Sequence, residues 1–207
     1  MPTFSDPKFR ELDAKNRSAQ EQLDKGDWAG ALKTFQEVAD RARKLGIDTS
    51  WASWGLAICN DNLGDIGMAF ENMRDALRVD PLNLGKQATY DQIVQHLRAA
   101  LASPDLADDD PATPEVYGQL LRAGEADVGA HLAMARHLAA AGEHAVAMEL
   151  LEAVTRLNPG HRQAWERKAA AARSLGDAAL AGRCDVEAAG CAGSGDPFGI
   201  RQTQATA

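Results

Sequence analysis

The chain has 207 residues, of which 45% are hydrophobic, 25% charged and only 5% aromatic, a composition typical of a soluble, alanine-rich helical protein of one or two domains. Its 30 acidic and 22 basic side chains give a formal net charge of -8, which repels a phosphate backbone and argues against nucleic acid as a partner. No stretch reaches the roughly 18 to 20 apolar residues of a membrane span, and the first residues lack the apolar run of a secretory signal. We therefore expect a cytoplasmic protein without membrane insertion.

The predicted elements are helices that come in pairs. An amphipathic stretch at 6–25 meets Gly26, and a second at 28–44 carries apolar residues at helical spacing, which together predict a first hairpin. A second hairpin is predicted at 51–78, and it ends before Pro81 because proline disfavours helical geometry in the residue that precedes it.

The second half of the chain contains an interruption. An acidic segment with several prolines is expected to form a loop between two helices, and Gly124 is expected to end the second of them. In chain order we predict a helix at 85–102, a loop at 103–113, a helix at 114–123, hairpins at about 127–157 and 161–190, and a disordered tail at 191–207.

One spaced signature occurs four times. A glycine is followed by Asp or Glu, with an alanine five residues after the glycine and another seven residues before it. Small residues at both offsets suit two antiparallel helices where their backbones approach most closely, so the signature predicts a repeated helical hairpin. The four glycines are Gly26, Gly64, Gly142 and Gly176, and the last two are 34 residues apart.

The signature resembles the tetratricopeptide repeat (TPR) family, whose unit is a 34-residue helix-turn-helix. The second and third copies match best, because Pro81 and Pro159 fall where the family stops its second helix. The first copy has Arg43 at that position, and the fourth has Asp185 where a large apolar residue should pack, which suits a terminal unit facing water.

The resemblance implies an all-α fold, an α-solenoid of stacked antiparallel helix hairpins with four TPR-like units and one degenerate helix pair. Residues 1–102 would hold the N-terminal units and the following helix, 103–113 the acidic loop, and 114–190 the C-terminal units. Whether the loop separates two rigid halves is left open at this point.

No catalytic signature is present. The sequence contains no HExxH, no GxxxxGK[ST], no GxSxG and no paired cysteine site, so we expect neither an enzyme nor a cofactor nor a metal site. Three cysteines without CxxC spacing indicate reduced, mostly buried thiols. Stacked hairpins instead expose a concave surface suited to a peptide or a helix of another protein.

The family resemblance places particular residues on that concave face. In the second unit they include Trp51, Trp54, Ile58 and Asp61. Two tryptophans three residues apart share one helical face, which favours a binding anchor, although both rings could instead pack inward or against the loop at 45–49.

Polar concave positions in the other units complete the candidate site. Arginines there could pair with the carboxylates of an acidic ligand, or they could be solvated or paired locally. These residues are Asn16 and Arg17 in the first unit, Arg136 in the third, and Arg167 and Arg173 in the fourth.

Two classes of function follow from this pattern. The first is a bacterial-type adaptor or scaffold that binds a linear segment or helix of another protein. The second is a self-associating structural module that forms a homo-oligomer through a repeat end, particularly the first hairpin. An assembly or secretion chaperone is a variant of the first class. The lysines of the family's clamp for chaperone tails are missing.

Overall fold

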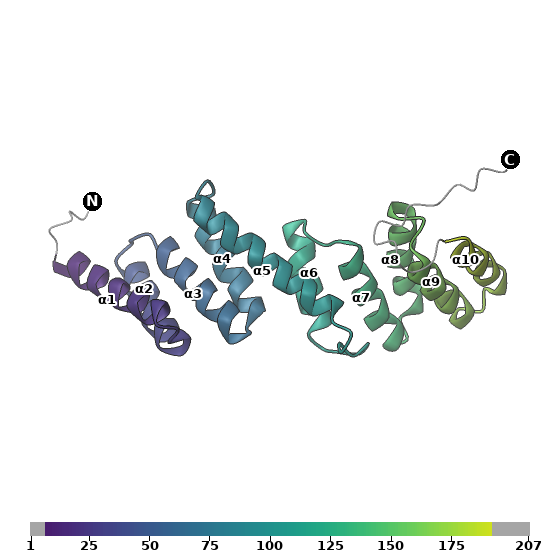
Figure 1. Cartoon of the computed structure of the whole chain (residues 1–207), viewed down its shortest axis with the longest axis horizontal. Helices are drawn as coiled ribbons and strands as arrows, with labels where there is room; N and C mark the ends of the chain where they lie inside the picture. The colour runs from purple at the N-terminus through teal and green to yellow at the C-terminus, as the bar shows by residue number, and fades with distance from the viewer. Residues whose placement is uncertain (1–6, 192–207) are drawn as a thin grey trace. The chain divides into compact units, whose positions relative to one another are not determined.

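The computed structural model describes residues 7–191, and over that range it consists of ten α-helices without a β-strand (Figure 1). The predicted all-α class is confirmed. The tail predicted to be disordered lies outside the described residues from 192 onward. The helices are α1 (Pro7–Asp24), α2 (Trp28–Lys44), α3 (Ser50–Leu63), α4 (Ile66–Val79), α5 (Leu84–Ala102), α6 (Thr113–Ala123), α7 (Val128–Ala140), α8 (His144–Leu157), α9 (Arg162–Ser174) and α10 (Ala178–Gly190).

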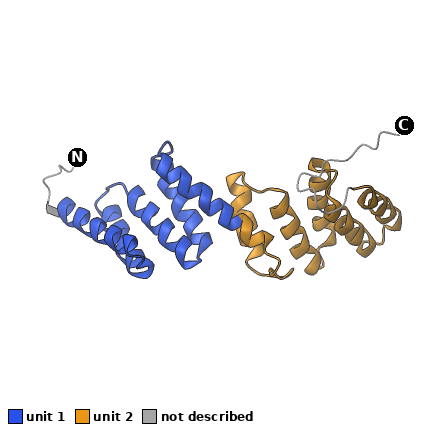
Figure 2. Ribbon diagram, viewed as in Figure 1, with its two compact units in different colours: residues 1–97 blue, residues 98–207 orange. Residues whose placement is uncertain are grey.

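The chain divides into two compact units, residues 1–97 and 98–207, and the division falls within α5 (Figure 2). Unit 1 contains the hairpins α1–α2 and α3–α4, and α2 packs on α3. Unit 2 contains α6 followed by the hairpins α7–α8 and α9–α10, with α8 packed on α9. Within each unit the architecture is thus a stack of antiparallel hairpins, as in an α-solenoid. The domain boundaries predicted at the acidic loop stay a prediction.

The signature glycines form the turns between paired helices. Gly64 has a φ of 84° and Gly176 a φ of 79°, a left-handed conformation that glycine adopts without a steric penalty. An aspartate that follows the glycine caps the next helix: a carboxylate oxygen of Asp65 accepts from the Met68 backbone N–H, and one of Asp177 accepts from the Leu180 N–H. Glu143, the one glutamate at this position, makes no such bond. The local sequence alone therefore directs a turn between two helices at these points.

The signature alanines lie where the helices cross. All eight are buried, with relative exposures of 0 to 3%. A side chain this small lets two helix backbones approach closely, and larger apolar residues then fill the space around the crossing. The eight are Ala19, Ala31, Ala57, Ala69, Ala135, Ala147, Ala169 and Ala181.

Each unit has its own apolar core. In unit 1 it includes Leu12, Phe35, Val38 and Leu56, and in unit 2 it includes Leu132, Leu151 and Val154. The three cysteines are buried, as predicted. None of the described helices combines the length and the apolar character that crossing a membrane demands.

Candidate partner-binding site

Two adjoining hollows lie on unit 1 between α1 and α3, the first helices of its two hairpins. Their volumes are about 130 and 160 Å³, and both are bordered by Asn16 and Trp51. The first is also lined by apolar side chains that include Phe9, Val38 and Ile47. Trp54, Gly55 and Ile58 line the second, together with Phe35 and Gln20. Sequence reasoning missed Phe9 and Ile47, which carry no signal beyond being apolar.

The two hollows together form a groove between α1 and α3. Trp51 is the most exposed aromatic side chain of this groove, with 60% of its surface open to solvent. Its ring lies 5.4 Å from that of Trp54, and the ammonium of the fully buried Lys86 lies 5.6 Å from the Trp51 ring. The same ammonium is 3.6 Å from a carboxylate oxygen of Asp80. One side of Trp51 is thus supported by a cation and a neighbouring ring, while most of its surface remains available for contact.

Trp54 is held in place by α5. Its Nε1–H donates to the Thr89 hydroxyl at 3.0 Å, and a Cβ added to Gly85 would lie only 3.0 Å from the ring. Trp54 is half-buried. The two tryptophans therefore differ: Trp54 is packed against α5, whereas Trp51 is exposed. Binding by Trp51 stays a prediction.

The other two candidates on α3 differ in accessibility. Ile58 is half-buried and lines the second hollow. The Asp61 side chain is only 4% exposed; it accepts from Gln92 Nε2 at 3.1 Å and lies 2.6 Å from His96 Nδ1. Asp61 is thus committed to α5 rather than open to a ligand.

The two candidates on α1 also differ. Asn16 lies at the junction of the two hollows, and its Oδ1 is buried without a hydrogen-bond partner. Arg17 is exposed, forms an ion pair with Asp13 one turn earlier at 2.6 Å, and does not line either hollow. A buried acceptor without a partner is unfavourable, so a hydrogen-bond donor of a ligand that reached Asn16 Oδ1 would be stabilised there.

The arginine candidates of unit 2 fall into two groups. Arg136 on α7 lies 3.5 Å from Asp108 of the acidic loop, and Arg167 on α9 is half-buried with an Nε that has no hydrogen-bond partner. Burial lowers the pKa of the Arg167 guanidinium, and the positive charge of Arg136 lowers it further. Arg173 instead pairs with Asp185 of α10, within its own hairpin. Arg136 and Arg167 thus lie on the contacting helices α7 and α9, whereas Arg173 is paired within its own hairpin.

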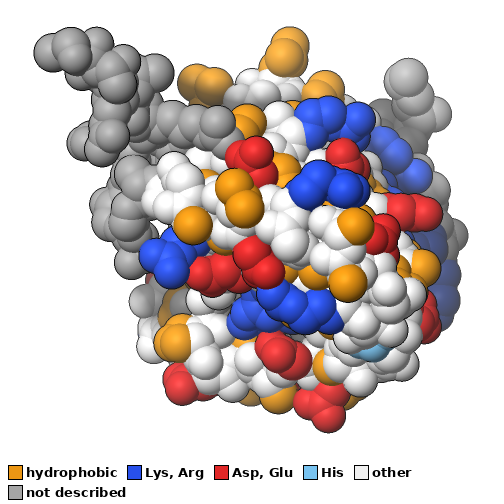
Figure 3. All heavy atoms as spheres, turned by 90° about the vertical axis from the view of Figure 1, so that its right-hand side faces the viewer, with side chains coloured by type: hydrophobic (Ala, Val, Ile, Leu, Met, Phe, Trp, Pro, Cys, Tyr) orange, Lys and Arg blue, Asp and Glu red, His pale blue; other side chains and the backbone are white. Residues whose placement is uncertain are grey.

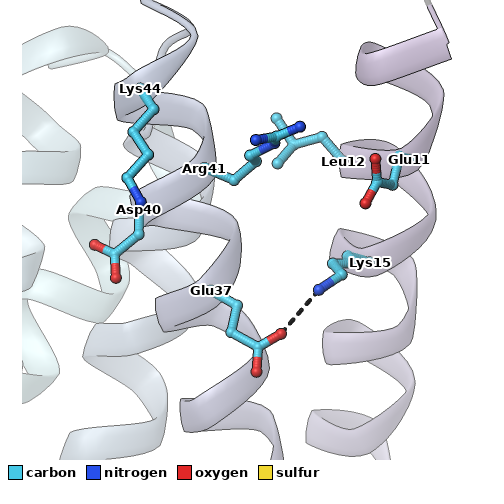
Figure 4. A pocket seen from close by; sticks show the side chains of 7 residues that line it. All are labelled: Glu11, Leu12, Lys15, Glu37, Asp40, Arg41 and Lys44. Carbon is cyan, nitrogen blue, oxygen red and sulfur yellow. Dashed lines mark hydrogen bonds and ion pairs between the residues drawn. The ribbon is translucent and has the colours of Figure 1, made fainter.

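A larger hollow of about 470 Å³ lies between α1 and α2 (Figure 4). Lys15 and Glu37 point toward each other across it and form a hydrogen-bonded ion pair at 2.9 Å, which raises the pKa of Lys15 and lowers that of Glu37. The hollow is lined by three acidic and three basic residues with one leucine, namely Glu11, Leu12, Lys15, Glu37, Asp40, Arg41 and Lys44. Its charges compensate one another, so it has no clear preference for a charged ligand.

The C-terminal end of unit 2 offers no single broad apolar surface in the view that displays it. Figure 3 shows apolar side chains there in small separate groups between acidic and basic ones. Exposed apolar residues of unit 2 include Leu157 in α8, Leu175 directly after α9 and Val186 in α10. Scattered apolar residues of this kind are ordinary on a protein surface.

Repeated antiparallel hairpins with glycine turns and alanine crossings define a helical repeat protein. Residues 128–181 match the family model for the tetratricopeptide repeat. This part of the chain is accordingly similar to a tetratricopeptide repeat. The matched residues cover the hairpin α7–α8, the helix α9 and the start of α10.

Comparisons over the whole chain add only distant likenesses. No curated protein matches the sequence. Among solved structures, a MamA protein has 16% sequence identity and a TM-score of 0.42, with 86% of this chain and 89% of that chain covered. MamA 41-end from Desulfovibrio magneticus RS-1 has 16% identity and a TM-score of 0.39, with 89% and 94% covered. Because both TM-scores lie below 0.5, no conclusion about function rests on them.

Proposed function

We propose that this protein is a non-catalytic adaptor that binds a peptide or a helix of a partner protein in the groove between α1 and α3. Tetratricopeptide repeats suggest a protein-interaction scaffold, because stacked hairpins present the side chains of their first helices along one continuous surface. The observation that carries the proposal is Trp51, which is 60% exposed between two hollows that share it.

The groove favours a partner segment with an apolar side chain. Phe9, Val38 and Ile47 line one hollow beside Trp51, and Phe35 and Ile58 line the other. An apolar side chain of the partner would remove surface from water on both sides of the contact. A rigid aromatic ring is an efficient anchor because few rotamers are lost when it is buried.

A polar feature of the groove would fix the orientation of such a segment. Asn16 lies between the two hollows and has an unsatisfied buried oxygen. A backbone N–H of an extended or helical segment is the most common donor that a partner protein offers. Rotation of the Asn16 amide would bring its oxygen to such a donor.

The alternative of self-association receives less support from the first hairpin. The open hollow of α1 and α2 is lined mainly by compensating charges, with Leu12 as its single apolar side chain. The centres of stable interfaces are depleted of charged residues and enriched in apolar and aromatic ones. A chaperone role would use the same groove as the adaptor and would differ only in the protein it binds.

The proposal is tested by Trp51→Ala in the full chain. Pull-down from the source organism's lysate first identifies the partner, and titration with the purified partner then measures the affinity. We expect a loss of roughly 2 kcal/mol, about 30-fold in Kd, with unchanged helicity. Trp54 is better left intact because its contacts with Thr89 and Gly85 support folding.

Leu157→Ala is the matched control, because Leu157 is 73% exposed and lies on unit 2. It should bind the partner as the unchanged chain does. Equal affinity of the Trp51→Ala protein would move the binding site away from this groove. Recovery of the protein itself as the sole binding partner would favour self-association.

A further inference from the structure

Two arginines lie on the contacting first helices of successive hairpins in unit 2. Arg136 lies on α7 and Arg167 on α9, and these two helices are in contact. The side chain of Arg136 is only 19% exposed, and Arg167 is half-buried. Burial lowers the pKa of Arg167 and the charge of Arg136 lowers it further, whereas the charges of Asp108 and Glu166 raise it.

The arginine pair is incompletely satisfied by the protein itself. The Nε of Arg167 is buried and has no hydrogen-bond partner. A buried donor without an acceptor is unfavourable, and two neighbouring cations increase the preference for an anion. Planar guanidinium groups bind a carboxylate best, because two parallel N–H groups can reach its two oxygens.

The acidic loop supplies one carboxylate to this pair. Asp108 lies 3.5 Å from Arg136 Nε, and its charge also acts on Arg167. The distance is longer than the 2.7 to 2.9 Å expected of a charge-assisted hydrogen bond, and the Asp108 side chain remains 54% exposed. Ion pairs that are this open to water contribute little to stability, so Asp108 is easily displaced.

We propose that Arg136 and Arg167 form a carboxylate-binding site for an acidic segment of a partner protein, and that Asp108 occupies this site in the free chain. The loop would then compete with a partner for the two arginines, so that only an acidic segment that binds more strongly than Asp108 occupies the site. A partner with several consecutive carboxylates displaces one aspartate because it can pair with both guanidinium groups at once.

The acidic sequence around Asp108 favours this interpretation over a simple surface contact. Four aspartates lie between residues 105 and 110, and in Asp108 the loop places one of them against the arginine pair. The loop is shaped by its own turns, since the Asp110 N–H donates to the Ala107 carbonyl and the Ala112 N–H to Asp110 Oδ1. Loss of the Asp108 contact therefore leaves the loop's internal hydrogen bonds intact.

This inference rests on the proposed adaptor function only in that its ligand is a segment of another protein. The site lies in unit 2 and contains no residue of the groove in unit 1. Trp51→Ala should therefore leave the binding of acidic peptides unchanged, which makes the failure of one proposal distinguishable from the failure of the other.

The test uses the full chain and a fluorescein-labelled peptide of eight aspartates, with binding followed by fluorescence anisotropy at constant ionic strength. Asp108→Asn should bind the peptide about 2- to 5-fold more tightly than Asp109→Asn, which makes the same change of charge in the same loop. Arg136→Gln combined with Arg167→Gln should bind at least about 10-fold more weakly than a charge-matched control with Arg156→Gln and Arg162→Gln.

Equal binding by the two loop variants would overturn the role of Asp108. Equal binding by the two arginine double variants, or no measurable binding of the peptide by any of the proteins, would overturn the site. If glutamine at these partly buried positions prevents folding, Arg136→Lys with Arg167→Lys decides instead. That variant keeps the charge and loses the paired N–H geometry, so it should bind the peptide at least about 3-fold more weakly than the unchanged chain does. Undiminished binding would contradict the proposal.

Discussion

Gly55 lies within α3, where this helix packs on α2 and its backbone faces the ring of Phe35. A Cβ added to Gly55 would lie 2.5 Å from Cζ of Phe35 and 2.6 Å from both of its Cε atoms. Phe35 is 2% exposed and belongs to the core of unit 1. Its ring also borders the second hollow, so a shift of the ring relieves only part of the overlap. We predict that Gly55→Ala destabilises unit 1.

The magnitude follows from two opposing effects. Overpacking a well-packed core costs about 1 to 3 kcal/mol. Alanine in place of glycine inside a helix contributes about 0.5 to 1 kcal/mol of stabilisation. With the midpoints of these two ranges, the net expectation is a loss of about 1 kcal/mol in the free energy of unfolding. Gly182→Ala in α10 is the control, because its added Cβ would meet no heavy atom within 4 Å. That variant should be stabilised by about 0.5 to 1 kcal/mol.

Urea unfolding followed by tryptophan fluorescence measures both effects, since Trp28, Trp51 and Trp54 lie in unit 1 with Gly55, and Trp165 lies in unit 2 with Gly182. Repeating Gly55→Ala in a Phe35→Leu background tests the cause, because a smaller side chain should reduce the loss. A neutral or stabilising Gly55→Ala would refute the close approach of α3 to Phe35. An unchanged loss in the Phe35→Leu background would assign the effect to another contact.

Two further predictions concern buried ionisable groups. Burial raises the pKa of the Cys59 thiol from 9.0 to about 11, so the unfolded chain loses this proton first and the free energy of unfolding should fall between these pH values. The fall should reach about 2 to 3 kcal/mol and be absent in Cys59→Ala. Urea unfolding at a series of pH values measures it, and parallel pH profiles for the unchanged chain and Cys59→Ala would contradict the prediction. Lys168 is 5% exposed, forms an ion pair with Glu152 and lies 4.9 Å from the centre of the Trp165 ring. Glu152→Gln should cost about 1 to 2 kcal/mol at pH 7, because it removes the countercharge of a buried ammonium. The Lys168 hydrogen bond lowers the pKa of Glu152, so this contribution is lost as pH falls below about 4.5, and an equal loss at pH 3 and pH 7 would show that the ion pair is not its source.

The helices and their ends followed closely from local sequence. The helices predicted at 85–102 and 114–123 are observed as Leu84–Ala102 and Thr113–Ala123. Gly124 ends α6 with a φ of 74°, as predicted. Glycine conformation, proline geometry and capping depend on residues within one or two turns, and that is why a single sequence was sufficient to locate them.

The candidate site was predicted only as a set of positions. The carboxylate of Asp61 meets His96, the indole of Trp54 meets Thr89, and Asp108 meets Arg136. The members of each pair lie on different helices or loops, 35, 35 and 28 residues apart in the sequence. The family pattern placed Trp51 and Trp54 on one face, but it contained no information on which ring α5 would hold.

The sequence by itself thus determined the repeated hairpin, the alanines at its crossings and the turns that join its helices. These features arise from backbone conformation and side-chain size, which each residue carries wherever it lies. Only the tertiary structure decided which predicted site residues remain accessible. Exposure and pairing depend on side chains that packing brings together from distant parts of the chain. For this reason Trp51 remains exposed, Asp61 is bonded to α5, and Arg136 and Arg167 lie on contacting helices.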